Sequence, residues 1–407
     1  MRARTRHPFA VYGAAACLAG GLAGPVSAQQ QAKPVTITAG IDVRHDDNVA
    51  RASAARAALR GVRQGDQSVS PNVSVVVLKP LGRHQVSLDG TLAYDFYRRN
   101  SFLNRERIGV TGSGLLQVSR CAITVSPAFS RRQSDLGEIA IPRGGGRDSV
   151  RNVQTTQVYG GTVECGGDIG LRPIAGIERT IQDNSTDFRQ FSDNRRTNYV
   201  AGLGYARPTF GKLQILLGID DVTYPNRPPI GDEEDGFTAR QGGVRFQREI
   251  GANLQATAQV NYMTLRPRRA DAPDFKGVTY DLSLLATLAD RLQIEAALSR
   301  SAQPALQSDA SYRVERQWAV SGTYALSSLL SLNADATFVK RRYAGERPTF
   351  GPLLGDDRRD TYAAGATYEF SPRLQFAANV RYQTREAGDP FYSFNSLSEV
   401  VSVKFVY

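Results

Sequence analysis

Alternation of apolar and polar residues, repeated along most of the chain, limits what this sequence can fold into more than any other feature. In residues 84–96 one apolar face collects Val86, Leu88, Leu92, Tyr94 and Phe96. Successive side chains of a β-strand point to opposite faces, so each such segment predicts a strand with one apolar and one wet face. A soluble sandwich gives the same local pattern. The number, length and spacing of the strands must therefore decide between the two.

The second half of the chain repeats these segments at a regular spacing. A leucine opens five of them and recurs every 38 to 44 residues, at Leu213, Leu254, Leu292, Leu330 and Leu374. One period contains a short turn, a strand, a long polar loop such as 224–236, and a returning strand. A β-propeller also repeats at about 40 residues, but it packs four short strands into that length. Two longer strands per period favour a tilted membrane-spanning barrel.

Counting the turns predicts an all-β, antiparallel, up-and-down transmembrane barrel of about 18 strands (16–18) over residues 29–407. Short turns are expected in the periplasm and long loops outside the cell. Upward strands are expected to begin near Val35, Gln85, Cys121, Ile169, Lys212, Asn253, Arg291, Leu330 and Arg373. Returning strands are expected near 68–79, 103–118, 153–165, 196–208, 237–248, 278–288, 312–325, 360–370 and 396–407.

The two ends of the chain fit export to the outer membrane of a Gram-negative cell. Three arginines, an apolar stretch over 9–24 and the small residues 26–28 predict a signal peptide over residues 1–28. At the other end, Val401, Val403, Phe405 and Tyr407 share one face. This resembles the terminal strand by which the outer-membrane assembly machinery recognises barrels. After cleavage the protein is expected to be integral to that membrane.

Two cysteines remain after the signal peptide, Cys121 and Cys165. An even number of cysteines in an exported chain favours a disulfide. Their midpoint lies inside the polar loop 134–149, so a symmetric hairpin would bring them together near the periplasmic rim. Two unpaired thiols are the alternative.

The charge pattern bears on partners. The net charge is +11, and the basic residues are spread along the chain without a concentrated tract. A nucleic-acid-binding protein needs a concentrated basic face, so that class is excluded. The expected partners are outer-membrane lipids, lipopolysaccharide phosphates or a polyanionic ligand.

Catalytic and metal-binding patterns are sparse. His45 with Asp46 and Asp47 could be read as a catalytic group, and Asp46, Asp47 and Asn48 as a calcium site. A solvated acidic loop is the commoner meaning of such a run. We therefore expect no enzyme, no cofactor and no metal.

The polar face of the strands defines the expected lumen, in which both charge signs alternate with amides. Its charged members are Arg107, Arg245, Arg313, Arg381, Lys404, Asp89, Asp281, Glu295, Asp335 and Glu369. Amides and carboxylates exchange hydrogen bonds with sugar hydroxyls as water does. Any water-filled barrel is lined in a similar way, so this lining alone does not select a sugar.

The segment 38–52, TAGIDVRHDDNVARA, resembles the start of the β-barrel porins that are associated with exopolysaccharide and capsule operons. Asp47, Asn48, Val49 and Arg51 match that family's motif, whereas Ala50 stands where an aromatic residue is expected. The resemblance implies a non-enzymatic channel that passes a secreted polysaccharide, with other secretion proteins as partners. Passive export of an exopolysaccharide is the leading expectation. A general or sugar-uptake diffusion porin is the alternative, and a barrel enzyme is the second alternative.

Overall fold

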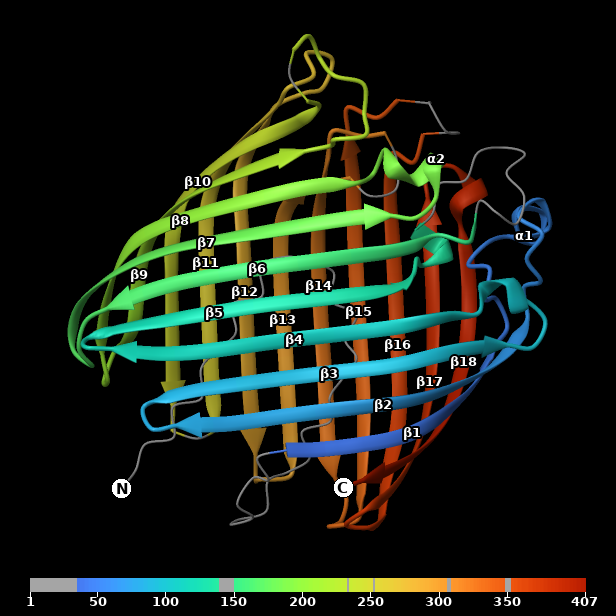
Figure 1. Ribbon diagram of the computed structural model, residues 1–407, viewed down its shortest axis with the longest axis horizontal. Coiled ribbons are helices and arrows are strands. Elements are labelled where there is room, and N and C mark those ends of the chain that lie inside the picture. Colours follow the sequence, from blue (N-terminus) through green and yellow to red (C-terminus); the bar gives the residue numbers. More distant parts are fainter. Residues whose placement is uncertain (1–34, 139–149, 233, 252, 306–308, 348–352) are drawn as a thin grey trace.

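The alternating segments form one closed β-sheet of 18 strands (Figure 1). The computed structural model describes residues 35–138, 150–232, 234–251, 253–305, 309–347 and 353–407. The expected signal peptide lies outside these residues. Each strand pairs antiparallel with its neighbours in sequence, and the first strand also pairs with the last, which closes the barrel. The expected fold class is confirmed.

The strands begin and end within a few residues of the expected positions. They are β1 (Val35–Asp46), β2 (Asp66–Leu81), β3 (His84–Tyr97), β4 (Arg105–Val118), β5 (Cys121–Gln133), β6 (Val153–Cys165), β7 (Gly170–Asn184), β8 (Asn194–Arg207), β9 (Gly211–Thr223), β10 (Gly236–Ile250), β11 (Leu254–Pro267), β12 (Phe275–Leu288), β13 (Leu292–Gln303), β14 (Tyr312–Ala325), β15 (Leu330–Ala344), β16 (Asp356–Ser371), β17 (Leu374–Ala387) and β18 (Phe394–Val406). Helical turns are short: α1 (Ala54–Leu59), α2 (Asp187–Gln190), η1 (Ser101–Leu103), η2 (Leu136–Glu138) and η4 (Pro390–Tyr392). No helix among the described residues is long and apolar enough to cross a membrane.

The two ends of the barrel differ, and we call them the turn end and the loop end. At the turn end successive strands are joined by tight turns. Between β12 and β13 the Arg291 amide donates to the Leu288 carbonyl at 3.1 Å, and the two central residues, Ala289 and Asp290, have positive φ of 48° and 55°, as a type I′ turn requires. At the loop end the connections are longer and carry α1 and α2 (Figure 1). The C-terminus lies at the turn end, where the Tyr407 amide donates to the Ile37 carbonyl at 2.8 Å.

Large apolar side chains cover the outer wall. Leu92 on β3 is 56% exposed, Leu217 on β9 66% and Trp318 on β14 61%. A soluble protein would bury most such residues, and contiguous exposed apolar patches mark contact with a partner or a membrane. The outer wall is therefore the lipid-facing surface that the alternation predicts.

Cys121 and Cys165 lie directly opposite each other in the register of β5 and β6, and a disulfide joins them. They share the outer face with Val125 and Tyr159, beside the tight turn that precedes β5. Both cysteines thus lie at the turn end, as the symmetric hairpin predicts.

Leu92 and Thr91 allow the two faces to be tested on one strand. Leu92 pairs with Val73 and Ile108 near the middle of the wall, whereas Thr91 faces the lumen. We expect Leu92→Arg to lower the free energy of unfolding by roughly 2–4 kcal/mol, because it places a charge in lipid near the midplane. Thr91→Arg should cost far less. Denaturant titration in lipid vesicles measures both, and equal losses would mean that the faces are assigned wrongly.

The disulfide makes a second prediction. Mass spectrometry of non-reduced peptides should recover the Cys121–Cys165 linkage. Reduction should lower the free energy of unfolding by roughly 2–4 kcal/mol, because it frees the intervening segment in the unfolded state. The double variant Cys121→Ser, Cys165→Ser is the control, since its stability should not respond to reductant. Free thiols at both positions in the native protein would contradict the register.

Candidate solute channel and its loop cover

The register places the ten predicted lumen residues on the inner wall. Residues directly opposite one another in a sheet share a face. Asp281 lies opposite Gln259, Asp335 opposite Ser321 and Arg381 opposite Ser398, all facing away from the exposed apolar side chains. The same relation holds for Arg107, Arg245, Arg313, Lys404, Asp89, Glu295 and Glu369. Their role in transport stays a prediction.

These ten residues do not have the same access to solvent. Asp89, Asp281, Glu295 and Arg381 are exposed on the inner wall, and Arg107 is partly exposed. Arg313 is only 2% exposed, so it cannot meet a solute in the lumen as the sequence suggests. Its guanidinium lies 3.4 Å from the Glu315 carboxylate, which also accepts from Arg341 at 2.7 Å. Arg313 therefore belongs to a buried ion cluster at the loop end.

The cause of this burial is a layer of folded loops, which we call the loop cover. Two of its apolar clusters come mainly from connecting segments. One contains Ala50, Ala52, Ala57, Val62, Leu103, Leu136 and Val150, and the other contains Ala305, Ala310, Tyr343, Leu354 and Tyr392. Burial of apolar side chains in loops means that the loops pack on one another instead of standing free in water. The polar loops that the sequence predicts are therefore packed instead of solvated; the apolar residues within 49–62 were the available signal.

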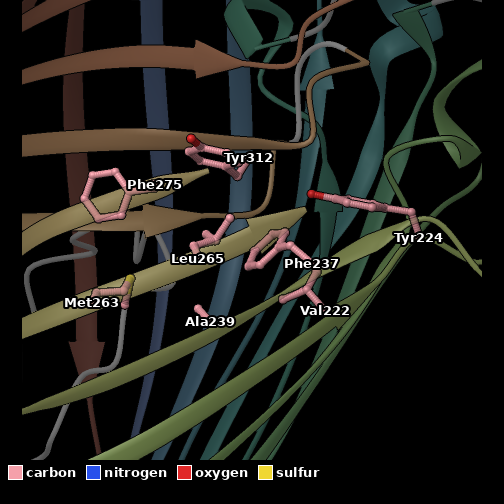
Figure 2. Packing of buried hydrophobic residues seen from close by; sticks show 8 residues of the cluster. All are labelled: Val222, Tyr224, Phe237, Ala239, Met263, Leu265, Phe275 and Tyr312. Atoms are coloured by element: carbon pink, nitrogen blue, oxygen red, sulfur yellow. The ribbon is translucent and has the colours of Figure 1, made fainter. Parts of the chain in front are cut away.

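A third apolar cluster lies at the loop end of β9–β14 and interrupts the polar inner wall (Figure 2). Its members are Val222, Tyr224, Phe237, Ala239, Met263, Leu265, Phe275 and Tyr312. Figure 2 shows Phe237, Leu265 and Met263 on neighbouring strands, with Tyr224 reaching in from the loop after β9. The Tyr224 hydroxyl donates to the Ser311 carbonyl at 2.9 Å and accepts from the Ala305 amide at 3.1 Å. It joins the loop after β9 to the loop after β13.

Buried arginines connect the loops through backbone carbonyls. Arg60 donates to the carbonyls of Ala50, at 2.9 Å, and Leu136, at 3.0 Å, and so links the loop after β1 to the loop after β5. Arg227 donates to the carbonyls of Phe191 and Ala310, at 2.8 and 3.0 Å. A guanidinium has five donors in a fixed fork, so one side chain can tie several carbonyls together.

Arg56 shows how the loop cover holds a buried charge. Its guanidinium lies 4.5 Å from the Tyr392 ring centre and 4.9 Å from that of Phe391, and these rings provide cation–π contacts. Burial lowers the pKa of Arg56 to about 9. The group is thus still cationic at neutral pH. It ties α1 to the loop after β17.

The motif residues that carry the family resemblance lie at the seam between β1 and β18. Arg51, with a positive φ of 47°, makes a paired contact with Asp46 at 2.8 Å. Asn48 donates to the Asn395 carbonyl at 2.7 Å, and Asp47 accepts from the Leu397 amide at 2.7 Å. In the same turn Val49 packs against the first loop cluster. Asp47, Asn48 and Arg51 therefore have partners on β18 at the barrel seam, whereas Val49 packs in the loop cover.

This arrangement also bears on the calcium alternative. Arg51 occupies the Asp46 carboxylate, which lies among the residues considered for the ion. Across the described ranges, no group of three or more histidine, cysteine, aspartate and glutamate residues could hold a metal. The Arg51 guanidinium thus lies where a cation bound to Asp46 would have to sit.

A polar pocket opens on the inner wall where β1–β4 approach the loop end. It is lined by Asp42, Arg44, Ser68, Ser70, Asp95, Tyr97 and Arg107. The Ser70 hydroxyl donates to Asp95 at 2.6 Å, and the Arg107 guanidinium lies 3.5 Å from the same carboxylate. The Arg107 side chain is 44% exposed and keeps donors free for a solute. The pocket therefore offers hydroxyl, carboxylate and guanidinium groups to hydrated molecules.

Comparison with known proteins places this geometry in context. The family model described as "Putative beta-barrel porin 2" matches residues 38–407. A search of curated proteins gave no match.

Solved structures with a similar trace include OccK2 (OpdF) of Pseudomonas aeruginosa, crystallised with glucuronate, at 14% identity and a TM-score of 0.45, covering 92% of this chain and 98% of that one. OpdK of the same organism gives 13% identity and a TM-score of 0.45, covering 92% and 99%. A BenF-like porin from Pseudomonas fluorescens Pf-5 gives 12% and 0.46, covering 92% and 98%. At this level of similarity these proteins carry no argument about the solute of this chain.

Arg60 tests whether the loop cover lies across the passage. Arg60→Gln should remove buried hydrogen bonds worth about 1–3 kcal/mol to the loop layer and loosen it. Single-channel conductance in planar bilayers should rise, while the barrel should stay folded. Arg63→Gln, an exposed arginine in the same loop, is the matched control and should leave conductance unchanged. If Arg60→Gln also conducts like the native protein, the loop cover does not limit the flow.

Proposed function

Since the chain belongs to this family of outer-membrane β-barrel porins, we propose that it is a diffusion channel for small, hydroxylated and preferentially anionic solutes. It would work by passive conduction, without a cofactor or covalent chemistry. Short turns would face the periplasm and the loop cover would face the outside.

The burial of inward-facing residues at the loop end carries this proposal. Arg341 on β15, Leu265 on β11 and Arg385 on β17 all point inward and are almost inaccessible. Nearer the turn end, Asp281 and Glu295 point inward and are exposed. The loop cover thus reduces the opening on one side only. A reduced opening suits small solutes better than a continuous polymer.

The chemistry of the exposed inner wall supports the solute class. Asp89, Glu295 and Arg381 offer both charge signs to the water in the lumen. Carboxylates accept hydrogen bonds from hydroxyl groups, and guanidinium groups donate to them and to carboxylates. Many weak contacts of this kind let a hydrated molecule pass without being trapped. Arg107 and Arg381 supply the positive charge on this wall that an anionic member of the class would meet.

The polysaccharide-export expectation rests on the motif of Asp47, Asn48, Val49 and Arg51. Because each of these residues has a partner at the seam or in the loop cluster, structural contacts account for the motif whatever solute passes. The motif therefore gives no separate support for a secreted polysaccharide or for other secretion proteins as partners. Recognition of β18 by the assembly machinery stays a prediction.

Liposome swelling with a series of neutral sugars and sugar acids tests the proposed size limit. Monosaccharides and sugar acids should enter quickly, and the rate should fall steeply with oligosaccharide length. Arg60→Gln should move the limit to longer sugars. Entry of long polysaccharides at a rate close to that of small sugars would overturn the proposal and favour export.

Charge selectivity tests the role of the inner-wall arginines. The double variant Arg107→Gln, Arg381→Gln should shift the reversal potential in planar bilayers toward cation preference, because these charges act over a Debye length of about 8 Å at physiological salt. Lys79→Gln, on the outer wall, is the control and should not shift it. Arg313→Gln should leave selectivity unchanged but cost about 1–3 kcal/mol of stability, because Arg313 is buried. An unchanged reversal potential in the double variant would remove these arginines from the transport role.

A further inference from the structure

Four cationic side chains form one continuous row across adjacent strands. In the register, Arg300 on β13 lies opposite Arg316 on β14, Arg316 opposite Lys340 on β15, and Lys340 opposite Arg358 on β16. These four strands lie side by side in Figure 1. With strand spacings of about 4.8 Å, the row is about 14 Å long. We call it the cation row.

The cation row lies on the outer wall, not in the lumen. Arg316 has the same orientation as Trp318 and Val320, which are 61% and 53% exposed on the lipid-facing side. Two residues toward the turn end, Leu298, Trp318 and Phe338 form the next outward row of directly opposed residues. Aromatic residues of outer-membrane barrels gather where the hydrocarbon meets the headgroups. The cation row thus lies two residues closer to the loop end than the apolar band, at the depth of the lipid headgroups.

Within the described residues, the chain supplies partners only to the two ends of the row. At one end Arg358 pairs with Asp360 at 2.7 Å. At the other, Arg300 donates to the Val278 carbonyl at 3.0 Å and lies 5.6 Å from the Phe275 ring centre. Arg316 and Lys340, in the middle, are exposed and have no hydrogen bond or ion pair with any part of the chain that the structure describes.

Like charges directly opposite each other in a sheet destabilise it. Four cations at consecutive strand positions, the central two without a partner among the described residues, therefore need negative charge from outside the chain. At this depth the available anions are the phosphates of lipid headgroups. Arginine binds phosphate through its planar fork and lysine through a compact charge, so the row offers both modes of contact.

We propose that the cation row binds the phosphate groups of a phosphorylated lipid of the outer leaflet, with Arg316 and Lys340 as the central contacts. This site lies on the outer, lipid-facing side of the wall and not in the lumen, so it does not depend on the solute that the channel passes. Its effect is to fix the barrel's depth and orientation in the membrane on the β13–β16 side.

Lipid titration of the purified full-length barrel in neutral maltoside micelles tests the proposal. The probe is lipid A carrying both phosphates, and binding is measured by native mass spectrometry and by the rise in thermal unfolding temperature. The double variant Arg316→Gln, Lys340→Gln should bind about 30-fold more weakly, as expected for loss of two basic contacts with an anionic surface. In micelles without lipid A the same variant should unfold at an equal or higher temperature than the native chain, because repulsion within the row is reduced.

Matched variants and probes separate this site from general charge effects. Arg207→Gln with Arg248→Gln removes two exposed cations from the outer wall near the turn end and should leave lipid A binding unchanged. Arg316→Lys with Lys340→Arg preserves the charge and should retain most of the binding. Dephosphorylated lipid A should bind native chain and variant alike. Equal binding of phosphorylated lipid A to the native chain and the Gln variant would overturn the proposal, and so would equal stabilisation by inorganic phosphate alone.

Discussion

Closure of the backbone hydrogen-bond network is the constraint on which the rest of the structure depends. Within lipid there is no water to satisfy an unpaired N–H or C=O group, so a sheet can cross a membrane only if it has no free edge. Here β1 pairs with both β2 and β18, and the sheet has no edge. Once the sheet is closed, alternation fixes what faces lipid and what faces water. The apolar outer wall, the cation row and the charged inner wall are all consequences of the same two-residue period.

The loop end is organised by a different kind of interaction. Hydrogen bonds from Arg60, Arg227 and Tyr224 to carbonyls of distant loops, together with apolar clusters, build a layer that has its own small cores. Ion pairs add to it: the buried Arg269 and the exposed Arg347 both contact the exposed Asp271 carboxylate, and their guanidinium groups hold its pKa below the usual range. These contacts fix the geometry of the loop end.

The strands were predictable from sequence because alternation is a local signal. In a segment such as 84–96 it identifies the apolar and the polar face without information from the rest of the chain. The pairing of Cys121 with Cys165 followed from counting within one hairpin. The loop cover was not predictable in this way, because contacts such as Arg60 with Leu136 join segments with no shared period. The same limit explains Arg313: alternation gives its face, but only the loops above it determine that it is buried. The structural contacts of the motif at residues 47–51 were not predictable either, because its partners Asn395 and Leu397 lie near the other end of the chain.

The position of the Cys121–Cys165 disulfide has a consequence for how the barrel is made. The bond encloses β5, β6 and the segment between them, a single hairpin that needs no other strand to bring its ends together. An exported chain meets oxidising conditions before it reaches the membrane, so this hairpin can become covalently fixed while the remaining strands are still unpaired. The hairpin then enters assembly with its register already set. A slip of one residue between β5 and β6, which would turn every side chain to the wrong face, can no longer occur.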